Sequence, residues 1–210
     1  MAKRERSPKL TTPEFRVSYP SVFVARAAKK GEKEKFSVQM IFDKKTDITK
    51  MRQAVVDCAS ARWGTDQSKW PKNFQGPWHD GSEKDADGYG PSVVYANASS
   101  MNRPDVVDQK VNRIAESSGD FYGGCYAHAV VNPFSYDHPM GKVGVSFGLQ
   151  NLQKIRDGES FSGKAKAEDD FNELPMPDAQ VANAVGAGNS EAPKGGEAPA
   201  AAATGNPLGL

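Results

Sequence analysis

The sequence predicts a mainly β fold, a small elaborated barrel of five to seven antiparallel strands with one packed amphipathic helix. Three observations carry this prediction. An apolar residue stands at every second position between residues 36 and 42, residues 121–155 have the pattern of a long hairpin, and clear helical spacing is confined to residues 47–63. A parallel α/β sheet would need strands and helices to alternate regularly, and they do not.

The N-terminal part begins with residues 1–12, which we expect to be a mobile basic arm. Residues 13–28 then alternate between apolar and polar side chains. Pro20 is expected to bend this first strand or to form a bulge, because proline cannot donate to a ladder. A charged loop, residues 27–34, leads into the second strand. The core face of that strand is predicted to hold Phe36, Val38, Met40 and Phe42, with Lys35, Ser37, Gln39 and Ile41 on the other face.

A single helix is predicted between a cap at Thr46 or Asp47 and a stop at Gly64. A long polar and aromatic stretch follows, and a loop of this length inside a compact domain is usually functional or partly disordered. Two short strands are expected next, at residues 92–98 and 105–107.

The stretch 121–155 is predicted to form two strands joined by a wide, aromatic, proline-containing loop. The small residues of the first strand are placed inward under the helix, which turns Tyr122 and Tyr126 outward. The residues placed inward on the return strand are Val143, Val145, Phe147 and Leu149, and those placed outward are Lys142, Gly144, Ser146 and Gly148. That outward face is nearly bare, so either a ligand approaches it closely or a neighbouring helix or loop covers it.

Charge divides the chain into a body and a tail. Residues 168–210 hold seven acids and one base, whereas residues 1–167 carry 26 bases and 19 acids, a net charge of +7. The tail is rich in Ala, Gly and Pro and has no periodic apolar pattern, so we predict that it is disordered. A basic body with an acidic tail suits a protein that binds a polyanion, with the tail competing for that site or recruiting partners.

The sequence argues against a membrane protein, a secreted protein and an enzyme. No apolar run is long enough to span a membrane, no secretory signal is present, and Cys58 and Cys125 fit reduced core residues, so we expect a cytoplasmic protein. The acids of residues 80–87 lack the bidentate glutamate of a calcium loop, which favours a solvated acidic turn. No catalytic or metal-binding motif occurs, and we therefore expect no enzyme activity, no metal and no cofactor.

Binding of single-stranded nucleic acid needs cations that follow the backbone and aromatic rings on which bases stack. Candidate cations are Arg26, Lys29, Lys30, Lys33, Lys35, Arg103, Arg113 and Lys142. Candidate rings are Trp70, Trp78, Tyr95, Tyr122, Tyr126, Phe134 and Tyr136. The rings placed in loops, Phe74 among them, either stack on bases or cap the core.

Several stretches together, in order from about residue 12 to 171, resemble a family of single-stranded-DNA-binding proteins of tailed bacteriophages. They are FRVSYPSVF at 15–23, KFSVQMIFDK at 35–44, DGSEKDADGYG at 80–90, ANASSMNRPDVVD at 96–108, FYGGCYAHAVVNPFSYD at 121–137 and GVSFGLQNLQKIRDGESFSG at 144–163. The resemblance implies an OB-fold barrel, residues 13–167, and a flexible acidic tail, residues 168–210. Tails of this kind often end in clustered acids with a terminal aromatic residue, but this chain ends NPLGL.

The resemblance also directs the choice of site residues, because OB-folds bind on the face of strands two and three and on the flanking loops. That face adds Gln39 to the candidates. The DNA-binding set is Arg26, Lys29, Lys30, Lys33, Lys35, Gln39, Tyr95, Arg103, Tyr122, Tyr126, Phe134, Tyr136 and Lys142.

The function implied is non-enzymatic, sequence-independent binding of single-stranded DNA in phage DNA replication, recombination and repair. Replication proteins are candidate partners of the acidic tail, and a homodimer is a candidate assembly. The alternative is a phage structural or assembly protein in which the barrel is a protein–protein module and the same aromatic loops anchor the interface.

Overall fold

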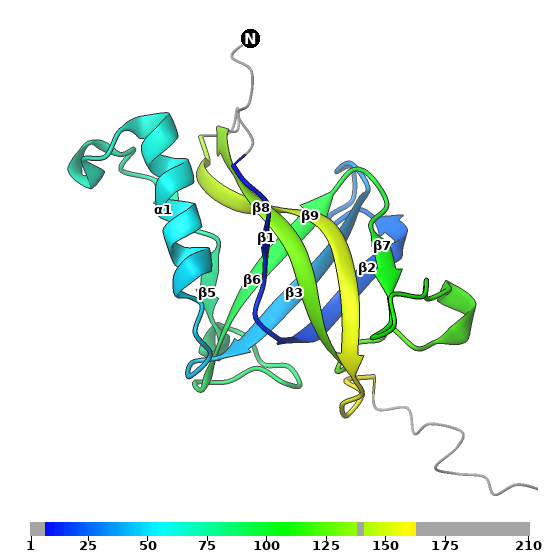
Figure 1. Cartoon of the computed structure of the whole chain (residues 1–210). Coiled ribbons are helices and arrows are strands. Elements are labelled where there is room, and N and C mark those ends of the chain that lie inside the picture. The colour runs from blue at the N-terminus through cyan, green and yellow to red at the C-terminus, as the bar shows by residue number, and fades with distance from the viewer. Residues whose placement is uncertain (1–6, 138–140, 163–210) are drawn as a thin grey trace, which may run out of the picture. The chain divides into compact units, whose positions relative to one another are not determined.

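The computed structural model describes residues 7–137 and 141–162, and it is a closed β-barrel (Figure 1). The chain divides after Asp170, and all of these residues belong to the first unit. Five long strands form the barrel in the order β8-β2-β3-β6-β9, and β9 pairs back with β8. Their bounds are β2 Phe15–Arg26, β3 Lys35–Asp43, β6 Val93–Ser100, β8 Tyr126–Asp137 and β9 Val143–Arg156. A five-stranded barrel of this kind is the OB-fold, as predicted.

Shorter elements decorate the barrel. The helices are α1 Thr49–Trp63 and the 3₁₀ turns η1 Gln67–Lys69, η2 Gly81–Glu83 and η3 Glu116–Ser118; the short strands are β1 Leu10–Thr11, β4 Phe74–Gln75, β5 Trp78–Asp80 and β7 Asp105–Val107. The sheet therefore has nine strands among the described residues, against the five to seven predicted. Pairing is also not wholly antiparallel, because β4, β6 and β7 run parallel to β9. Side-chain periodicity carries no information on strand direction, so the sequence could not show this.

The expected N-terminal arm includes β1, which pairs with β8. Thr12 is buried and its hydroxyl accepts a hydrogen bond from the backbone N–H of Ala129. The last residues assigned to the arm are thus part of the sheet, whereas residues 1–6 lie outside the described part of the chain. The predicted tail, residues 168–210, lies outside it as well.

The first two barrel strands follow their sequence pattern. The register of β2 against β3 shifts between Ser18 and Ser21, which places a bulge at Pro20 as expected. On β3, Val38, Met40 and Phe42 are buried in the core, but Ile41 on the opposite face is buried as well. The outer face of β3 is therefore covered by other parts of the chain.

The helix α1 begins close to its predicted cap, since the backbone N–H of Thr49 donates to the Asp47 carboxylate at 3.0 Å. Gly64, with φ +89°, ends it. Its buried side, which includes Met51, Val55 and Cys58, packs against β8 and β9. Both cysteines are buried free thiols, as predicted.

The hairpin of β8 and β9 corrects one expectation. Residues 132–137 are strand and not a wide loop, because β8 stays paired with β9 as far as Asp137 and Val143. Pro133 is tolerated because the β1 pairing stops at Val131, which leaves this end of β8 as an edge. The outer face of β9 is not bare either: Gly144 lies against the backbone carbonyl of Gln75, and Gly148 lies against the side chain of Asn132.

Candidate nucleic-acid interface

The outer face of β3 and β6 is crossed by residues 80–90, the acidic segment. Asp80 fixes the start of this segment, because its carboxylate pairs with Lys44 at 2.8 Å and accepts hydrogen bonds from the backbone and hydroxyl groups of Ser82. The bond from Lys44, with those from Ser82, holds the pKa of Asp80 well below its usual range. Most acids of the segment are exposed, as in a solvated turn, but Lys84 and Tyr89 turn onto the sheet.

Lys84 lies among three tyrosine rings on this face. Its ammonium is 4.2 Å from the ring centroid of Tyr19, 4.7 Å from that of Tyr89 and 5.5 Å from that of Tyr95. It donates to the side-chain oxygen of Gln39 at 2.7 Å. No carboxylate of the described residues lies within ion-pair distance of it. The site therefore holds a half-buried cation that π faces stabilise and that no carboxylate of the described residues neutralises. We call Tyr19, Tyr89 and Tyr95 the tyrosine cluster.

The rings of this cluster hold one another in place. Tyr95 stacks on His79 at 4.9 Å between centroids, and Tyr89 meets Tyr95 edge-on at 5.2 Å. Burial raises the pKa of Tyr89 to about 12, so its hydroxyl stays protonated at neutral pH and donates to Gln39. Neutral phenol rings beside a cation can stack on bases without repelling phosphates.

Tyr19 is the most accessible ring of the cluster. It lies at the β2 bulge with φ +44°, and 57% of its surface is exposed. A bulky residue with positive φ is strained, and such residues are concentrated at functional sites. The strain here keeps a large aromatic ring on the surface, where it buries little apolar area.

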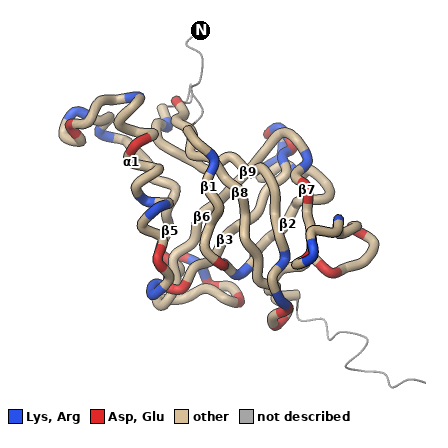
Figure 2. Tube along the Cα trace, viewed as in Figure 1, with Lys and Arg blue, Asp and Glu red and all other residues tan. Residues whose placement is uncertain are grey.

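The charged loop between β2 and β3 gathers the predicted cations. Arg26 lies directly opposite Lys35 in the ladder, and the three loop lysines are exposed; these are Lys29, Lys30 and Lys33. Arg103 reaches the same end, with its guanidinium 5.7 Å from the ring centroid of Phe23. Like charges opposite each other are unfavourable unless an anion binds. Figure 2 shows basic residues gathered here, on the side of the barrel away from α1.

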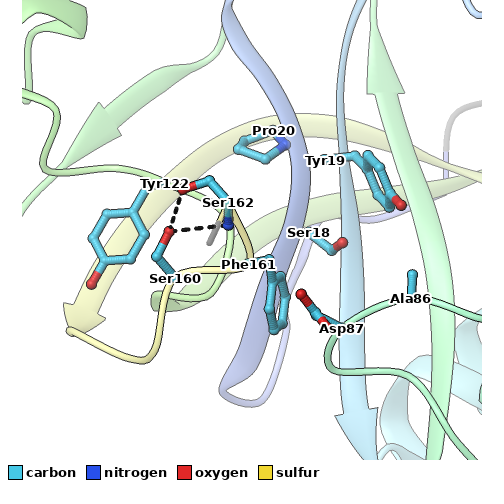
Figure 3. Close-up of a pocket in the computed structure, with 10 residues that line it drawn as sticks. Ser18, Tyr19, Pro20, Ala86, Asp87, Tyr122, Ser160, Phe161 and Ser162 are labelled. Carbon is cyan, nitrogen blue, oxygen red and sulfur yellow. Dashed lines mark hydrogen bonds between the residues drawn. The ribbon is translucent and has the colours of Figure 1, made fainter. Parts of the chain in front are cut away.

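Beyond Tyr19 the surface opens into a pocket of about 480 Å³ (Figure 3). It lies between the β2 bulge, the acidic segment and two chain segments, residues 121–124 and 160–162. We call it the Phe161 pocket, because the ring of Phe161 projects into it from the chain that follows β9. Tyr122, one of the predicted residues, also lines it.

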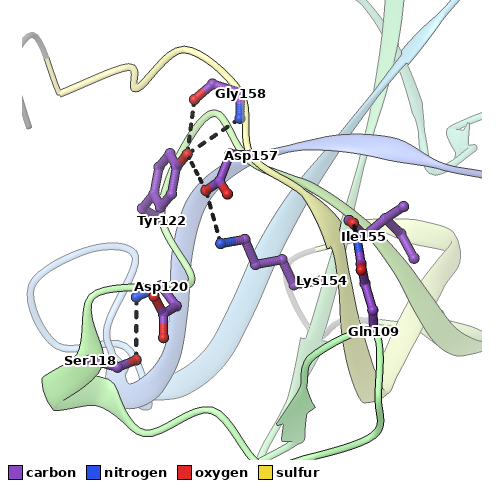
Figure 4. A network of polar contacts seen from close by, with 8 residues as sticks. All are labelled: Gln109, Ser118, Asp120, Tyr122, Lys154, Ile155, Asp157 and Gly158. Carbon is purple, nitrogen blue, oxygen red and sulfur yellow. Dashed lines mark hydrogen bonds and ion pairs between the residues drawn. The ribbon is translucent and has the colours of Figure 1, made fainter. Parts of the chain in front are cut away.

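Tyr122 and Tyr126 are both half-buried, and a cation lies beside each ring; the Lys154 ammonium is 5.6 Å from the ring centroid of Tyr122. The Tyr122 hydroxyl donates to the Asp157 carboxylate at 2.8 Å, and that carboxylate also pairs with Lys154 (Figure 4). The Tyr126 ring is covered by Arg156, its cross-strand neighbour, whose guanidinium is 3.4 Å from the ring centroid. A base could stack on Tyr126 only if Arg156 moved.

The other predicted residues lie elsewhere. Phe134 and Tyr136 face outward on β8 opposite Ser146 and Gly144, near the end of the hairpin that lies beside α1 (Figure 1), and Lys142 is exposed at the start of β9. Within the described ranges, no hydrogen bond, ion pair or ring contact links them to the tyrosine cluster. The structure thus brings Gln39, Tyr95 and Tyr122 together along one face and leaves this group apart.

Three loop aromatics considered as stacking residues cap the core instead. They are Trp70, Phe74 and Trp78, which are partly buried against the core. Trp78 packs edge-on against Phe42 and Phe147, and Phe74 contacts both Trp63 and Trp70. The core-capping interpretation of these rings is confirmed.

Sequence reasoning missed four residues of this face: Tyr19, Lys84, Tyr89 and Phe161. A signal existed for two of them. Pro20 predicted the bulge that exposes its neighbour Tyr19, and Phe161 is an apolar residue isolated after the last strand. Nothing local to residues 80–90 showed that they fold onto the sheet.

No group of three or more His, Cys, Asp or Glu side chains in residues 7–137 and 141–162 is arranged to hold a metal ion. In the same residues, no helix has both the length and the apolar character that crossing a membrane requires.

Fold and surface define a class: an OB-fold barrel with a basic loop and a tyrosine-lined outer face. The comparison with protein families is specific. The chain belongs to the family described as the single-stranded-DNA-binding protein of Enterobacter phage Enc34, whose model matches residues 8–182. The family resemblance noted from the sequence is thereby confirmed, and the family is defined by binding to DNA and not by a catalytic activity.

The chain is also similar to individual proteins. Putative protein p50 of Acyrthosiphon pisum secondary endosymbiont phage 1 is 39% identical over 98 residues, which are 46% of this chain and about half, 52%, of that protein. The single-stranded-DNA-binding protein from bacteriophage Enc34, in a complex with single-stranded DNA, has a TM-score of 0.60 at 20% identity, covering 73% of this chain and 89% of its own. The single-stranded-DNA-binding protein gp2.5 of bacteriophage T7 has a TM-score of 0.56 at 11% identity, and the match covers 82% of this chain and 98% of gp2.5. At these identities the two structures show a shared fold.

Proposed function

We propose that the protein binds single-stranded DNA, without catalysis and largely without regard to sequence, in phage DNA replication, recombination and repair. The observation that carries this proposal is Lys84, a half-buried cation with no acidic partner among the described residues, held within three tyrosine rings on the outer face of β3 and β6. Membership of the Enc34 family supports it.

The proposed strand enters at the loop of residues 27–34 and continues across the tyrosine cluster. Phosphates would meet the loop lysines and Lys84, which supply affinity that falls with salt. Bases would stack on the exposed rings, each contributing about 1–3 kcal/mol, and only an unpaired strand offers its base faces in this way. The preference for single strands thus arises from the rings, and the affinity arises from the cations.

The tail, residues 168–210, completes the proposal. Its net charge of −6 suits a competitor for the basic face, and replication proteins of the host or phage are the partners we propose for it. The protein would act in the host cytoplasm, and a homodimer is the proposed assembly.

The test is fluorescence anisotropy of a labelled oligo(dT) titrated with the full chain at several salt concentrations, with duplex DNA as competitor. We expect tight binding at low salt, a linear fall of log affinity with log salt and little competition by duplex. No binding at low salt, or equal binding to duplex, would refute the proposal. Copurification with virions in the absence of DNA binding would instead support a structural or assembly role.

A further inference from the structure

The Phe161 pocket has the walls of a site for a flat ring. Its apolar surfaces come from Tyr19, Pro20, Tyr122 and Phe161. Its polar groups come from Asp87 and from three serines, Ser18 on β2 and Ser160 and Ser162 after β9 (Figure 3). At about 480 Å³ it falls in the range of small-molecule sites, which combine apolar walls with a few placed polar groups. It is open to solvent and adjoins the tyrosine cluster through Tyr19, which belongs to both.

Phe161 is held in place by neighbouring residues of the chain. The guanidinium of Arg16 lies 4.3 Å from its ring centroid, and its backbone N–H donates to the carbonyl of Gly123 at 2.9 Å. Gly88 closes the edge of the ring: a Cβ added there would lie 2.2 Å from Cζ of Phe161. A ring fixed in this way loses little conformational freedom when a base stacks on it, which favours binding.

The Asp87 carboxylate at the edge of the pocket can distinguish between bases. Asp87 is exposed, and its carboxylate makes no hydrogen bond or ion pair with any described residue. An ionised carboxylate only accepts hydrogen bonds. Cytosine presents its N4 amino group as a donor, whereas thymine presents the O4 carbonyl at the same position, which a carboxylate repels.

We propose that the Phe161 pocket takes one unstacked base of the bound strand and that Asp87 favours a base with an exocyclic amino group there over thymine. This rests on the proposed binding of single-stranded DNA and adds a local base preference to it. The preference would be modest, because the rest of the face contacts only phosphates and the stacking faces of bases, which do not distinguish one base from another.

The carboxylate is tested by Asp87→Asn against Asp85→Asn. Both variants remove one negative charge from the same exposed segment, but only Asp87 lines the pocket. The measurement is the ratio of the dissociation constants for oligo(dC) and oligo(dT) by anisotropy, with the full chain. We expect D87N to lower the relative affinity for oligo(dC) about fivefold, and D85N to leave the wild-type ratio unchanged. Equal ratios in the two variants would overturn the base preference.

The ring is tested by Phe161→Leu, which keeps apolar packing on Gly88 and removes the stacking face. The probe is oligo(dT) with single 2-aminopurine substitutions, whose fluorescence is quenched by stacking. We expect quenching on binding to wild type and a clear loss of quenching with F161L, while anisotropy still shows binding and the thermal unfolding midpoint confirms the fold. Equal quenching in both proteins would overturn the pocket. If wild type binds neither oligo(dC) nor oligo(dT), the proposed function itself has failed.

Discussion

Replacing Lys84 by glutamine tests the centre of the proposed interface. Lys84→Gln removes a charge that no described carboxylate neutralises, while it keeps a polar side chain of similar length beside Gln39. If the ammonium meets one phosphate, the slope of log affinity against log salt falls in magnitude by about 0.7, the value for one contact with a single strand. Loss of one charge-assisted contact lowers affinity about tenfold at low salt, or about 1.4 kcal/mol.

Stability should change less than binding. The variant loses cation–π contacts worth about 0.5–1 kcal/mol each at partly exposed sites, but it no longer buries a cation, which offsets part of that loss. Burial already lowers the pKa of Lys84, which indicates that the folded protein bears a desolvation cost for this charge. We expect a thermal midpoint close to that of the wild type.

Lys72→Gln is the matched control, because Lys72 is exposed and lies between η1 and β4, away from the tyrosine cluster. Both variants are compared by anisotropy with oligo(dT) across a salt series. A K84Q protein with the same slope and affinity as K72Q would refute the role given to Lys84.

Three further outcomes are expected. Deletion of residues 168–210 should tighten binding to oligo(dT) at low salt, since six net negative charges leave, and an unchanged affinity in the same titration would remove the competitor role of the tail. Gly88→Ala should destabilise the fold by about 1–2 kcal/mol in urea unfolding and dislodge Phe161. Gly31→Ala is the control, because Gly31 has a similar φ but open space around it, and it should lose only the free energy of placing a Cβ at positive φ. Equal losses of unfolding free energy in the two variants would contradict the packing of Gly88 against Phe161. Asp80 has a lowered pKa in the folded protein, so its contribution to stability is present above about pH 4 and disappears as pH falls below that. The difference in thermal midpoint between wild type and Asp80→Asn should therefore shrink between pH 7 and pH 3. A constant difference would argue against the ion pair of Asp80 with Lys44.

Local patterns predicted the strands and the core well. Side chains alternate across a strand regardless of its partners, so the burial of Val38, Met40 and Phe42 on β3 could be predicted without knowledge of the sheet. Phe36 is only half-buried, and Ile41 is buried on the opposite face, because burial at those positions depends on what covers the strand. The same argument placed Ala127 and Ala129 inward on β8, where they are fully buried. Pro133 led to the wrong prediction of a loop, because proline is typical of loops. An edge strand also tolerates proline, but which strands are edges is known only from the full sheet.

The binding face was harder to predict because it depends on which segments meet. The cover on Tyr126 comes from Arg156, and only the register of β8 against β9 brings the two together. Lys84 reaches Tyr19 and Tyr95 because residues 80–90 fold across three strands. Gln39 and Tyr95 were both among the candidates, and the pairing of β3 with β6 puts them on the same outer face.

The place of β9 in the sheet has a consequence for how the protein is made. This strand pairs with β4, β6, β7 and β8, and it is the last element of the barrel along the chain. Until residue 156 has been synthesised, the edges of β6 and β8 that β9 will occupy have no partner, and unpaired edges invite association with other chains. We therefore expect the barrel to close only after its final strand leaves the ribosome, in a slow step dominated by contacts between distant residues.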